Sequence, residues 1–285
     1  MLIPARLNGA IAAIEQGRVA FTTFCPPDIA SAQAVAEAGF DAVVFEMEHN
    51  PYDARVLKDC LQYLLSPRRI ATAGHVAPSP TPMVRLPCNG EEMNQWMAKQ
   101  ALDAGVYGII WPHIRTVEQA RSAVAACRYA RPPEEANYEP AGRRGDGPRA
   151  AARYWGLTQP EYYERADVWP LQSDGELLVG MMCESVEAMR NLPAILKHVP
   201  GMQLVIIGEG DLSQNLGVPR QYGHPKVVEA IAEIIAVCKE HNVVCGHPHA
   251  DTGNVEAIVD AGFGWVMAGP TPSFAALKRG RELTT

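Results

Sequence analysis

Eight short apolar runs, each followed by a stretch with helical spacing, constrain the fold of this chain more than any other feature. The predicted strands cover 19–24, 41–49, 83–87, 108–114, 176–184, 204–208, 243–247 and 265–269. The helices predicted after them cover 28–39, 53–65, 91–105, 116–130, 186–198, 226–241, 254–262 and 273–283. Eight strand-then-helix units are the number that closes a (β/α)8 TIM barrel. A doubly wound open sheet is the alternative, but it requires a glycine-rich turn after the first strand. The chain has the sequence FCPPD there, so we favour the barrel.

Two segments interrupt the alternation within the single barrel domain that we predict for residues 1–285. Residues 66–82 are rich in Pro and Gly and are predicted to be a surface excursion. Residues 131–175 are rich in Pro, Gly and Arg, and such a long irregular segment is usually a functional loop or disordered. Its tyrosines and tryptophans favour an ordered excursion.

Two helix starts carry capping signals. Asp28 is the predicted N-cap of the helix 28–39, and Thr116 with Gln119 is a predicted capping box.

Composition and charge exclude several classes of protein. The net charge of −7 argues against a nucleic-acid-binding surface, which would be basic. The seven cysteines are odd in number, scattered and without a C-x-x-C motif, which favours a reducing compartment over a disulfide framework or a zinc site. The amino-terminal segment lacks the apolar region of a signal peptide, and no apolar run is long enough to span a bilayer. We therefore expect a soluble cytoplasmic protein without nucleic-acid or membrane partners.

Ionisable residues gather where the predicted strands end. Barrel enzymes place their active sites at the carboxyl ends of the strands. One charged residue there could be a solvated strand end, but acids, bases and an arginine on one rim favour a catalytic site. The residues in question are Glu46, Glu48, His49, Arg85, His113, Glu184, Asp211, His247 and His249.

Glu184 and Asp211 end the fifth and sixth predicted strands, which are neighbours in a barrel. Two hard oxygen ligands with positions left for water and substrate suit Mg²⁺, Mn²⁺ or a similar divalent ion. The alternative is that each carboxylate caps the following helix, which is plausible for Asp211. We favour the metal site.

Several motifs occur together in order along nearly the whole chain: AGFDAVVFEMEH, VRLP, ALDAGVYGIIWPHIRTVEQAR, RRG…ARYWG, CESVEAMRNLP, IGEGDLSQNLG and HPKVVEAI. Together they resemble the HpcH/HpaI class II pyruvate aldolases. The resemblance implies a TIM barrel of the phosphoenolpyruvate/pyruvate-superfamily type. It also implies homo-oligomers, hexamers or trimers, in which the C-terminal helix is exchanged between neighbouring subunits.

The same resemblance assigns roles to individual residues. His49 is implied to be the catalytic base, paired with Asp103, and Arg85 to hold the keto oxygen of the substrate. Glu184 and Asp211 are implied to bind Mg²⁺, Mn²⁺ or Co²⁺. Backbone amides around three consecutive residues are implied to receive the pyruvate carboxylate, namely Gly208, Glu209 and Gly210.

The chain also departs from the family pattern. Glu46-Met47-Glu48-His49 replaces Asp-x-Glu-His, and we expect Glu46 and Glu48 to contact and orient the catalytic groups. Met182 replaces a glutamine near the metal, and GEGDLS replaces GPADLS. The helix between Arg85 and Asp103 is about one turn longer than usual, which weakens the assignment of Asp103.

Three histidines stand where the family is usually less basic: His113, His247 and His249. They are predicted to contact an acidic or hydroxylated aldehyde portion of the substrate. The alternative is that they are solvated residues of the rim.

These observations predict a metal-dependent aldolase that reversibly cleaves a 4-hydroxy-2-oxo acid to pyruvate, or a close 2-oxo acid, and an aldehyde. The C–C cleavage needs a base for the C4 hydroxyl and a group that stabilises the enolate. Two alternatives are a 2-oxo-diacid decarboxylase, or another carbon–carbon lyase with the same metal–enolate chemistry, and a catalytically silent ligand-binding relative.

Overall fold

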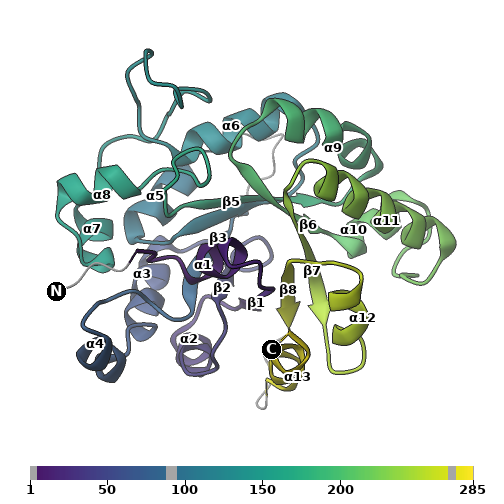
Figure 1. The fold of residues 1–285 in the computed structure, drawn as a ribbon, viewed down its shortest axis with the longest axis horizontal. Helices are drawn as coiled ribbons and strands as arrows, with labels where there is room; N and C mark the ends of the chain where they lie inside the picture. Colours follow the sequence, from purple (N-terminus) through teal and green to yellow (C-terminus); the bar gives the residue numbers. More distant parts are fainter. Residues whose placement is uncertain (1–4, 88–94, 269–273, 285) are drawn as a thin grey trace.

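Eight parallel strands form a closed barrel in the order of the sequence, which confirms the predicted (β/α)8 fold (Figure 1). The computed structural model describes residues 5–87, 95–268 and 274–284. The strands are β1 (Ala20–Cys25), β2 (Ala42–Glu46), β3 (Thr81–Arg85), β4 (Gly108–Trp111), β5 (Leu178–Cys183), β6 (Met202–Ile207), β7 (Val244–Ala250) and β8 (Trp265–Ala268).

Helices surround the barrel and connect its strands. In the described part of the chain they are α1 (Gly9–Glu15), α2 (Ile29–Ala36), α3 (Ala54–Tyr63), α4 (Pro67–Ala73), α5 (Trp96–Ala104), α6 (Val117–Cys127), α7 (Arg149–Trp155), α8 (Gln159–Arg165), α9 (Val186–His198), α10 (Glu209–Asn215), α11 (Pro225–Glu240), α12 (Val255–Asp260) and α13 (Ala275–Thr284). None of them is long and apolar enough to span a membrane.

The predicted caps are present. The Asp28 carboxylate accepts a hydrogen bond from the Ser31 amide, and the Thr116 and Gln119 side chains form the reciprocal capping box at the start of α6. The predicted starts of the third and last helices lie outside the described residues, as does the predicted end of the eighth strand at Gly269.

Several short helices were missed because they are too short to show a helical period. α4 lies in the predicted surface excursion 66–82, and α7 and α8 lie in the predicted irregular segment 131–175. Each has local signals instead: Ser66 caps α4, Thr158 and Glu161 form a capping box for α8, and Gly156 ends α7 in a left-handed conformation. α1 and α10 were also not predicted.

The core has two layers. Apolar side chains of the strands fill the inside of the barrel, and a second set packs between the strands and the outer helices. α1, which lies in front of the strands in Figure 1, adds Ala10, Ile11 and Ala13 to the inner layer. It begins beside the amino-terminal ends of β4 and β5, because Asn8 donates to the carbonyls of Tyr107 and Glu176. α1 therefore closes the end of the barrel opposite the predicted site.

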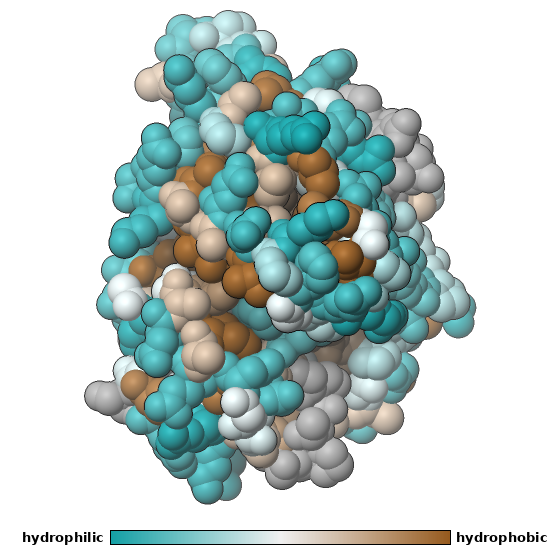
Figure 2. Space-filling view, turned by 90° about the vertical axis from the view of Figure 1, so that its right-hand side faces the viewer, coloured by the Kyte–Doolittle hydropathy of each residue, from teal (hydrophilic) through white to brown (hydrophobic). Residues whose placement is uncertain are grey.

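The outer helices turn one apolar face to the barrel. In α11, Val227, Ala230, Ile234 and Cys238 are buried, whereas Val228 is 52% exposed. Figure 2 views the side of the molecule on which α11 lies, and hydrophilic residues cover most of it, with hydrophobic patches between them. A buried apolar face and an exposed polar face are typical of helices that pack on the outside of a barrel.

Candidate active site

A cavity of about 240 Å³ brings together residues from several strand ends at the carboxyl end of the barrel. Of the predicted site residues, its lining includes His49, Arg85, Glu184, Asp211 and His249. The cavity is smaller than the roughly 300–1,000 Å³ that is typical of drug-sized ligands, which favours a small substrate.

Arg85 is the last residue of β3 and is fixed on several sides. Its register partner on β2 is Glu46, whose carboxylate lies 2.7 Å from Nη2 and 3.3 Å from Nε. Nη1 lies 3.0 Å from the Glu48 carboxylate, and the guanidinium carbon lies 4.5 Å from the centroid of the Phe24 ring. Because the side chain is buried and held by two carboxylates and a ring, its position is set before any ligand binds.

Glu46 also ends β2. Its carboxylate accepts hydrogen bonds from the amides of Glu48, at 2.7 Å, and His49, at 3.4 Å. This bends the chain out of the strand, so the predicted strand 41–49 ends three residues early and Glu48 and His49 lie on the following loop. The His49 side chain is 68% exposed, and its Nε2 lies 3.6 Å from Glu48 Oε2. Glu46 therefore holds the backbone of both following site residues, and its predicted orienting role in catalysis stays a prediction.

His113 connects two carboxylates. It follows β4 with a positive φ of 54°, and its Nε2 lies 3.4 Å from Glu48 while its Nδ1 lies 3.1 Å from Glu184. The hydrogen bond to Glu48 raises the pKa of His113, against the effect of burial, and the nearby carboxylates add to the rise. Burial acts to raise the pKa of Glu48, but His113, Arg85 and His49 together lower it. Because both ring nitrogens face protein carboxylates, His113 positions Glu48 and Glu184. His113 is not among the residues that line the cavity, where it was predicted to contact the substrate.

Glu184 has one engaged and one open oxygen. Oε1 accepts a hydrogen bond from the His113 amide at 2.6 Å, whereas no described residue donates to Oε2. Oε2 lies against Gly208, where a β-carbon would be 2.6 Å from it, so only glycine leaves room for this carboxylate. Burial raises the pKa of Glu184, and the negative charges of Glu48 and Asp211 add to the rise while His113 opposes it.

This donor set fits a hard divalent cation. Two carboxylates that repel one another and face the same cavity are stabilised by a bound positive charge. Within the described residues no group of three or more His, Cys, Asp or Glu side chains is placed to hold a metal alone. Glu184 and Asp211 therefore suit an ion such as Mg²⁺, which keeps several water ligands and binds through one or two carboxylates.

Glu209, which also lines the cavity, forms a cluster with two histidines. Its carboxylate lies 2.9 Å from His249 Nδ1 and 3.4 Å from His247 Nε2. Burial acts to raise the pKa of Glu209, but the two histidines lower this pKa to about 2. His249 lines the cavity beside Glu209, whereas His247 is held behind the carboxylate and is not part of the lining.

Asp103 and Gly208 differ from the predicted arrangement. The Asp103 carboxylate, on α5, pairs with Arg144 of the 131–175 segment at 2.9 Å and does not line the cavity. The carboxylate that lies beside His49 is Glu48 instead. The amide of Gly208 donates to the carbonyl of Cys183 at 3.1 Å, so this amide is already used by a hydrogen bond between β5 and the end of β6. The amides of Glu209 and Gly210 remain the predicted receivers of a substrate carboxylate.

Sequence reasoning missed four residues of the cavity lining: Phe24, Arg220, Tyr222 and Pro248. Phe24 stands near the end of β1, and the rule that barrel sites lie at strand ends could have found it. Arg220 and Tyr222 lie in the loop between α10 and α11, and no sequence signal that we know places that loop at the mouth of the barrel.

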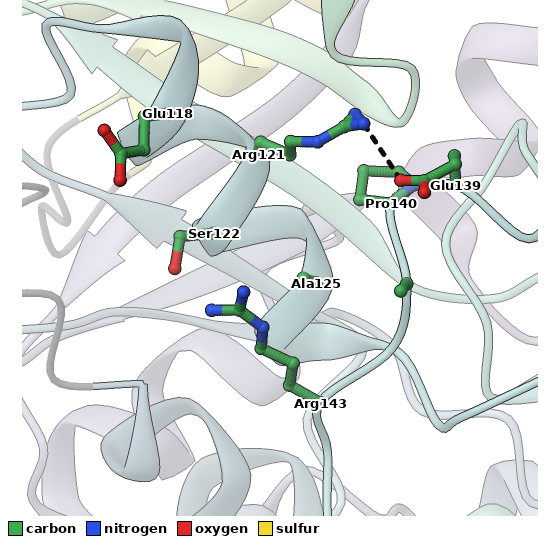
Figure 3. Close-up of a pocket in the computed structure, with 8 residues that line it drawn as sticks. Glu118, Arg121, Ser122, Ala125, Glu139, Pro140 and Arg143 are labelled. Carbon is green, nitrogen blue, oxygen red and sulfur yellow. Dashed lines mark ion pairs between the residues drawn. The ribbon is translucent and has the colours of Figure 1, made fainter.

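A second cavity, of about 290 Å³, lies between α6 and the segment 139–143 (Figure 3). Its polar lining includes an ion pair of 2.9 Å between Arg121 and Glu139, and the side chain of Arg143 points toward Ser122. None of the predicted catalytic residues lines it. The cavity at the carboxyl end of the barrel is therefore the candidate active site.

A closed (β/α)8 barrel whose carboxyl-end cavity is lined by arginines, histidines and the carboxylates of Glu184 and Asp211 defines a barrel enzyme. A family model described as HpcH/HpaI aldolase/citrate lyase matches residues 23–272, and the chain belongs to this family. It is 33% identical to a hydroxypyruvate/pyruvate aldolase of Roseobacter denitrificans over 91% of this chain and 90% of that protein. It is also 33% identical to a 4-hydroxy-2-oxo-heptane-1,7-dioate aldolase of Shigella sonnei, over 74% of this chain and 68% of that protein.

Solved structures agree with this assignment. An HpcH/HpaI aldolase/citrate lyase family protein from Burkholderia cenocepacia superimposes with a TM-score of 0.72 at 27% identity, covering 93% of this chain and 92% of that one. A citrate synthase, SbnG, superimposes with a TM-score of 0.69 at 22% identity, over 93% and 91% of the two chains, which indicates a shared fold. The chain is accordingly an enzyme of the aldolase and lyase type.

Proposed function

We propose that this enzyme is a divalent-metal-dependent aldolase that reversibly cleaves a 4-hydroxy-2-oxo acid to pyruvate, or a close 2-oxo acid, and an aldehyde. The observation that carries the proposal is the fixed guanidinium of Arg85 in one small cavity with His49, Glu184 and Asp211. The names of the relatives, pyruvate aldolase and 4-hydroxy-2-oxo acid aldolases among them, support the same chemistry.

Arg85 is suited to hold the keto oxygen. A guanidinium carries five N–H groups, two on each terminal nitrogen. Nη2 donates one to Glu46 and Nη1 faces Glu48, so one N–H on each terminal nitrogen is left for a ligand. As the C3–C4 bond breaks, negative charge moves onto this oxygen, and a preorganised cation stabilises it most in the transition state.

His49 is suited to move the proton of the C4 hydroxyl. An imidazole can accept and release a proton, and the exposed ring of His49 can exchange that proton with solvent. A neighbouring carboxylate orients an imidazole and stabilises its charged form. Because Glu48 is the carboxylate beside His49, we assign this positioning role to Glu48 in place of Asp103.

Glu184 and Asp211 are the residues that would hold the metal ion, for which Mg²⁺, Mn²⁺ and Co²⁺ are the candidates. A bound divalent ion would polarise the 2-oxo acid and add to the stabilisation of the enolate. The 2-oxo acid, the aldehyde, the cytoplasmic location and the homo-oligomer with an exchanged C-terminal helix stay predictions.

The test is exchange of the C3 protons of pyruvate in D₂O, followed by NMR, which needs no knowledge of the aldehyde. We expect exchange with Mg²⁺, Mn²⁺ or Co²⁺, loss of exchange with a chelator, and loss in His49→Gln and Arg85→Gln. Arg190→Gln, on the outer face of α9, is the matched control for the removal of a charge. Absence of exchange with both pyruvate and hydroxypyruvate, whichever metal is added, would overturn the proposal.

A further inference from the structure

Arg220 is an arginine in an unfavourable backbone conformation at the mouth of the active-site cavity. Its φ of 58° lies in the left-handed region, which side chains other than glycine rarely adopt. The conformation is held by a short chain of hydrogen bonds: the Arg220 amide donates to Ser213 Oγ at 2.9 Å, and Ser213 Oγ donates to the Gly210 carbonyl at 2.7 Å. Strained residues that the surroundings hold in place often have a functional role.

Among the described residues, no carboxylate pairs with the guanidinium of Arg220. It is exposed, it lines the cavity, and it forms no ion pair with any residue that the structure describes. The other arginine of the cavity, Arg85, is paired with Glu46 and Glu48. Arg220 thus brings a positive charge without a described ion-pair partner to the cavity of the proposed aldolase site, and a guanidinium fork matches the oxygens of a carboxylate or phosphate.

His249 and Tyr222 line the same cavity as Arg220. Their rings are stacked, with centroids 6.3 Å apart and planes 23° apart. His249 Nδ1 lies 2.9 Å from Glu209, so this nitrogen carries a proton that it donates to the carboxylate. Nε2 of His249 therefore remains for a ligand, and the ring is kept in one orientation by the hydrogen bond and the stacking.

Resting on the proposed function, we propose that Arg220, with His249 and Tyr222, binds an anionic group at the aldehyde end of the substrate. Arg85, Glu184 and Asp211 serve the 2-oxo acid half, and Arg220 lies in the loop outside them. The preferred acceptor is then a short aldehyde that carries a carboxylate or a phosphate. Arg220 is a specificity residue, and the C–C bond cleavage itself does not use it.

The experiment compares matched aldehydes in the aldol direction with pyruvate as donor. Succinic semialdehyde is compared with butanal, which has the same chain length without the carboxylate, and glyceraldehyde 3-phosphate is compared with glyceraldehyde. The quantity measured is the ratio of kcat/KM for the anionic aldehyde to that for its neutral partner. In Arg220→Gln we expect this ratio to fall about tenfold for one of the pairs, chiefly through KM. The pair whose ratio falls more identifies the anion as carboxylate or phosphate.

Arg190→Gln removes a charge away from the cavity and is expected to keep the wild-type ratios. Unchanged ratios for both pairs in Arg220→Gln would overturn the inference, as would an equal fall in Arg190→Gln. Failure of the proposed function is recognised separately, because the wild-type protein would then not exchange the C3 protons of pyruvate.

Discussion

The two ends of β5 each bury a glutamate, but they do so in different ways. Glu176 precedes the strand, at the end of the barrel closed by α1, and Glu184 follows it, at the open end. Burial raises the pKa of both. At Glu176, the amides of Leu7 and Asn8 donate to the two carboxylate oxygens, and Arg165 pairs with one of them at 3.0 Å. At Glu184, one oxygen is engaged and the other faces the cavity.

The comparison shows that the glutamate at one end of β5 stabilises the fold, whereas the glutamate at the other end is available to a ligand. A buried carboxylate whose hydrogen bonds are complete holds neighbouring segments together, and here Glu176 ties the residues before α1 to the start of β5. A buried carboxylate with an open oxygen is unfavourable in the free protein but available to a ligand. We therefore expect substitutions of the two glutamates to have opposite consequences for activity and stability.

The largest expected effect is on activity at the open end. Glu184→Gln should lower kcat/KM for aldol cleavage by at least about a hundredfold, because in the proposed mechanism it removes a charged ligand next to the developing enolate. Its unfolding free energy should not fall, because the amide oxygen can still accept from the His113 amide. Glu176→Gln is the matched control at the closed end, and the folded variant should keep its activity. Wild-type activity in Glu184→Gln would contradict the assignment of the site.

At the closed end, the expected effect is on stability. Glu176→Ala should lower the unfolding free energy by about 3–5 kcal/mol, since it leaves two buried amides without their acceptor and removes the carboxylate that pairs with Arg165. Urea denaturation followed by circular dichroism measures the change. An effect below about 1 kcal/mol would mean that α1 is not anchored through this carboxylate.

The pH dependence gives a second measure of the same contact. Because the folded protein holds the proton of Glu176 more tightly than the unfolded chain does, its contribution to stability is greatest at low pH. That contribution is lost as pH rises from the ordinary glutamate pKa through the raised one in the folded state. Across this pH window, the unfolding free energy of the wild-type protein should therefore fall relative to that of Glu176→Gln, by up to about 1.4 kcal/mol per pH unit.

The smallest expected effect concerns Arg220. Arg220→Gly should raise the unfolding free energy by about 0.5–1 kcal/mol, because glycine adopts a positive φ without strain. The same change should lower the preference for an anionic aldehyde. Arg220→Ala is the control, since it also removes the guanidinium but keeps the strain. If both variants are equally stable, the left-handed conformation is not the source of the difference.

Much of the fold follows from local sequence patterns. The alternation of strands and helices predicts the barrel, and strand ends predict Glu46, Arg85 and Glu184 at one rim, because parallel neighbours end at the same edge. The register of β2 and β3 makes Glu46 and Arg85 direct neighbours. That pair could be predicted once the two strands were identified.

Other parts of the site depend on contacts that no local pattern encodes. His113 faces Glu48 and Glu184 because its backbone adopts a positive φ after β4. Asp103 pairs with Arg144 because the 131–175 segment folds back onto α5. Arg220 reaches the cavity from a loop that follows α10, so the rule of strand ends does not apply to it.

Closure of the barrel sets the order in which the chain can fold during synthesis. Thr22 on β1 donates to the carbonyl of Val266 on β8, 244 positions further along the chain. At about 5–20 residues per second, a ribosome synthesises a segment of that length in roughly 10–50 s. Until then β1 lacks its partner on one side, and the contacts of Leu7 and Asn8 with Glu176 also wait for distant residues. The nascent chain consequently exposes unpaired strand edges for most of its synthesis, when protection by a chaperone would matter most.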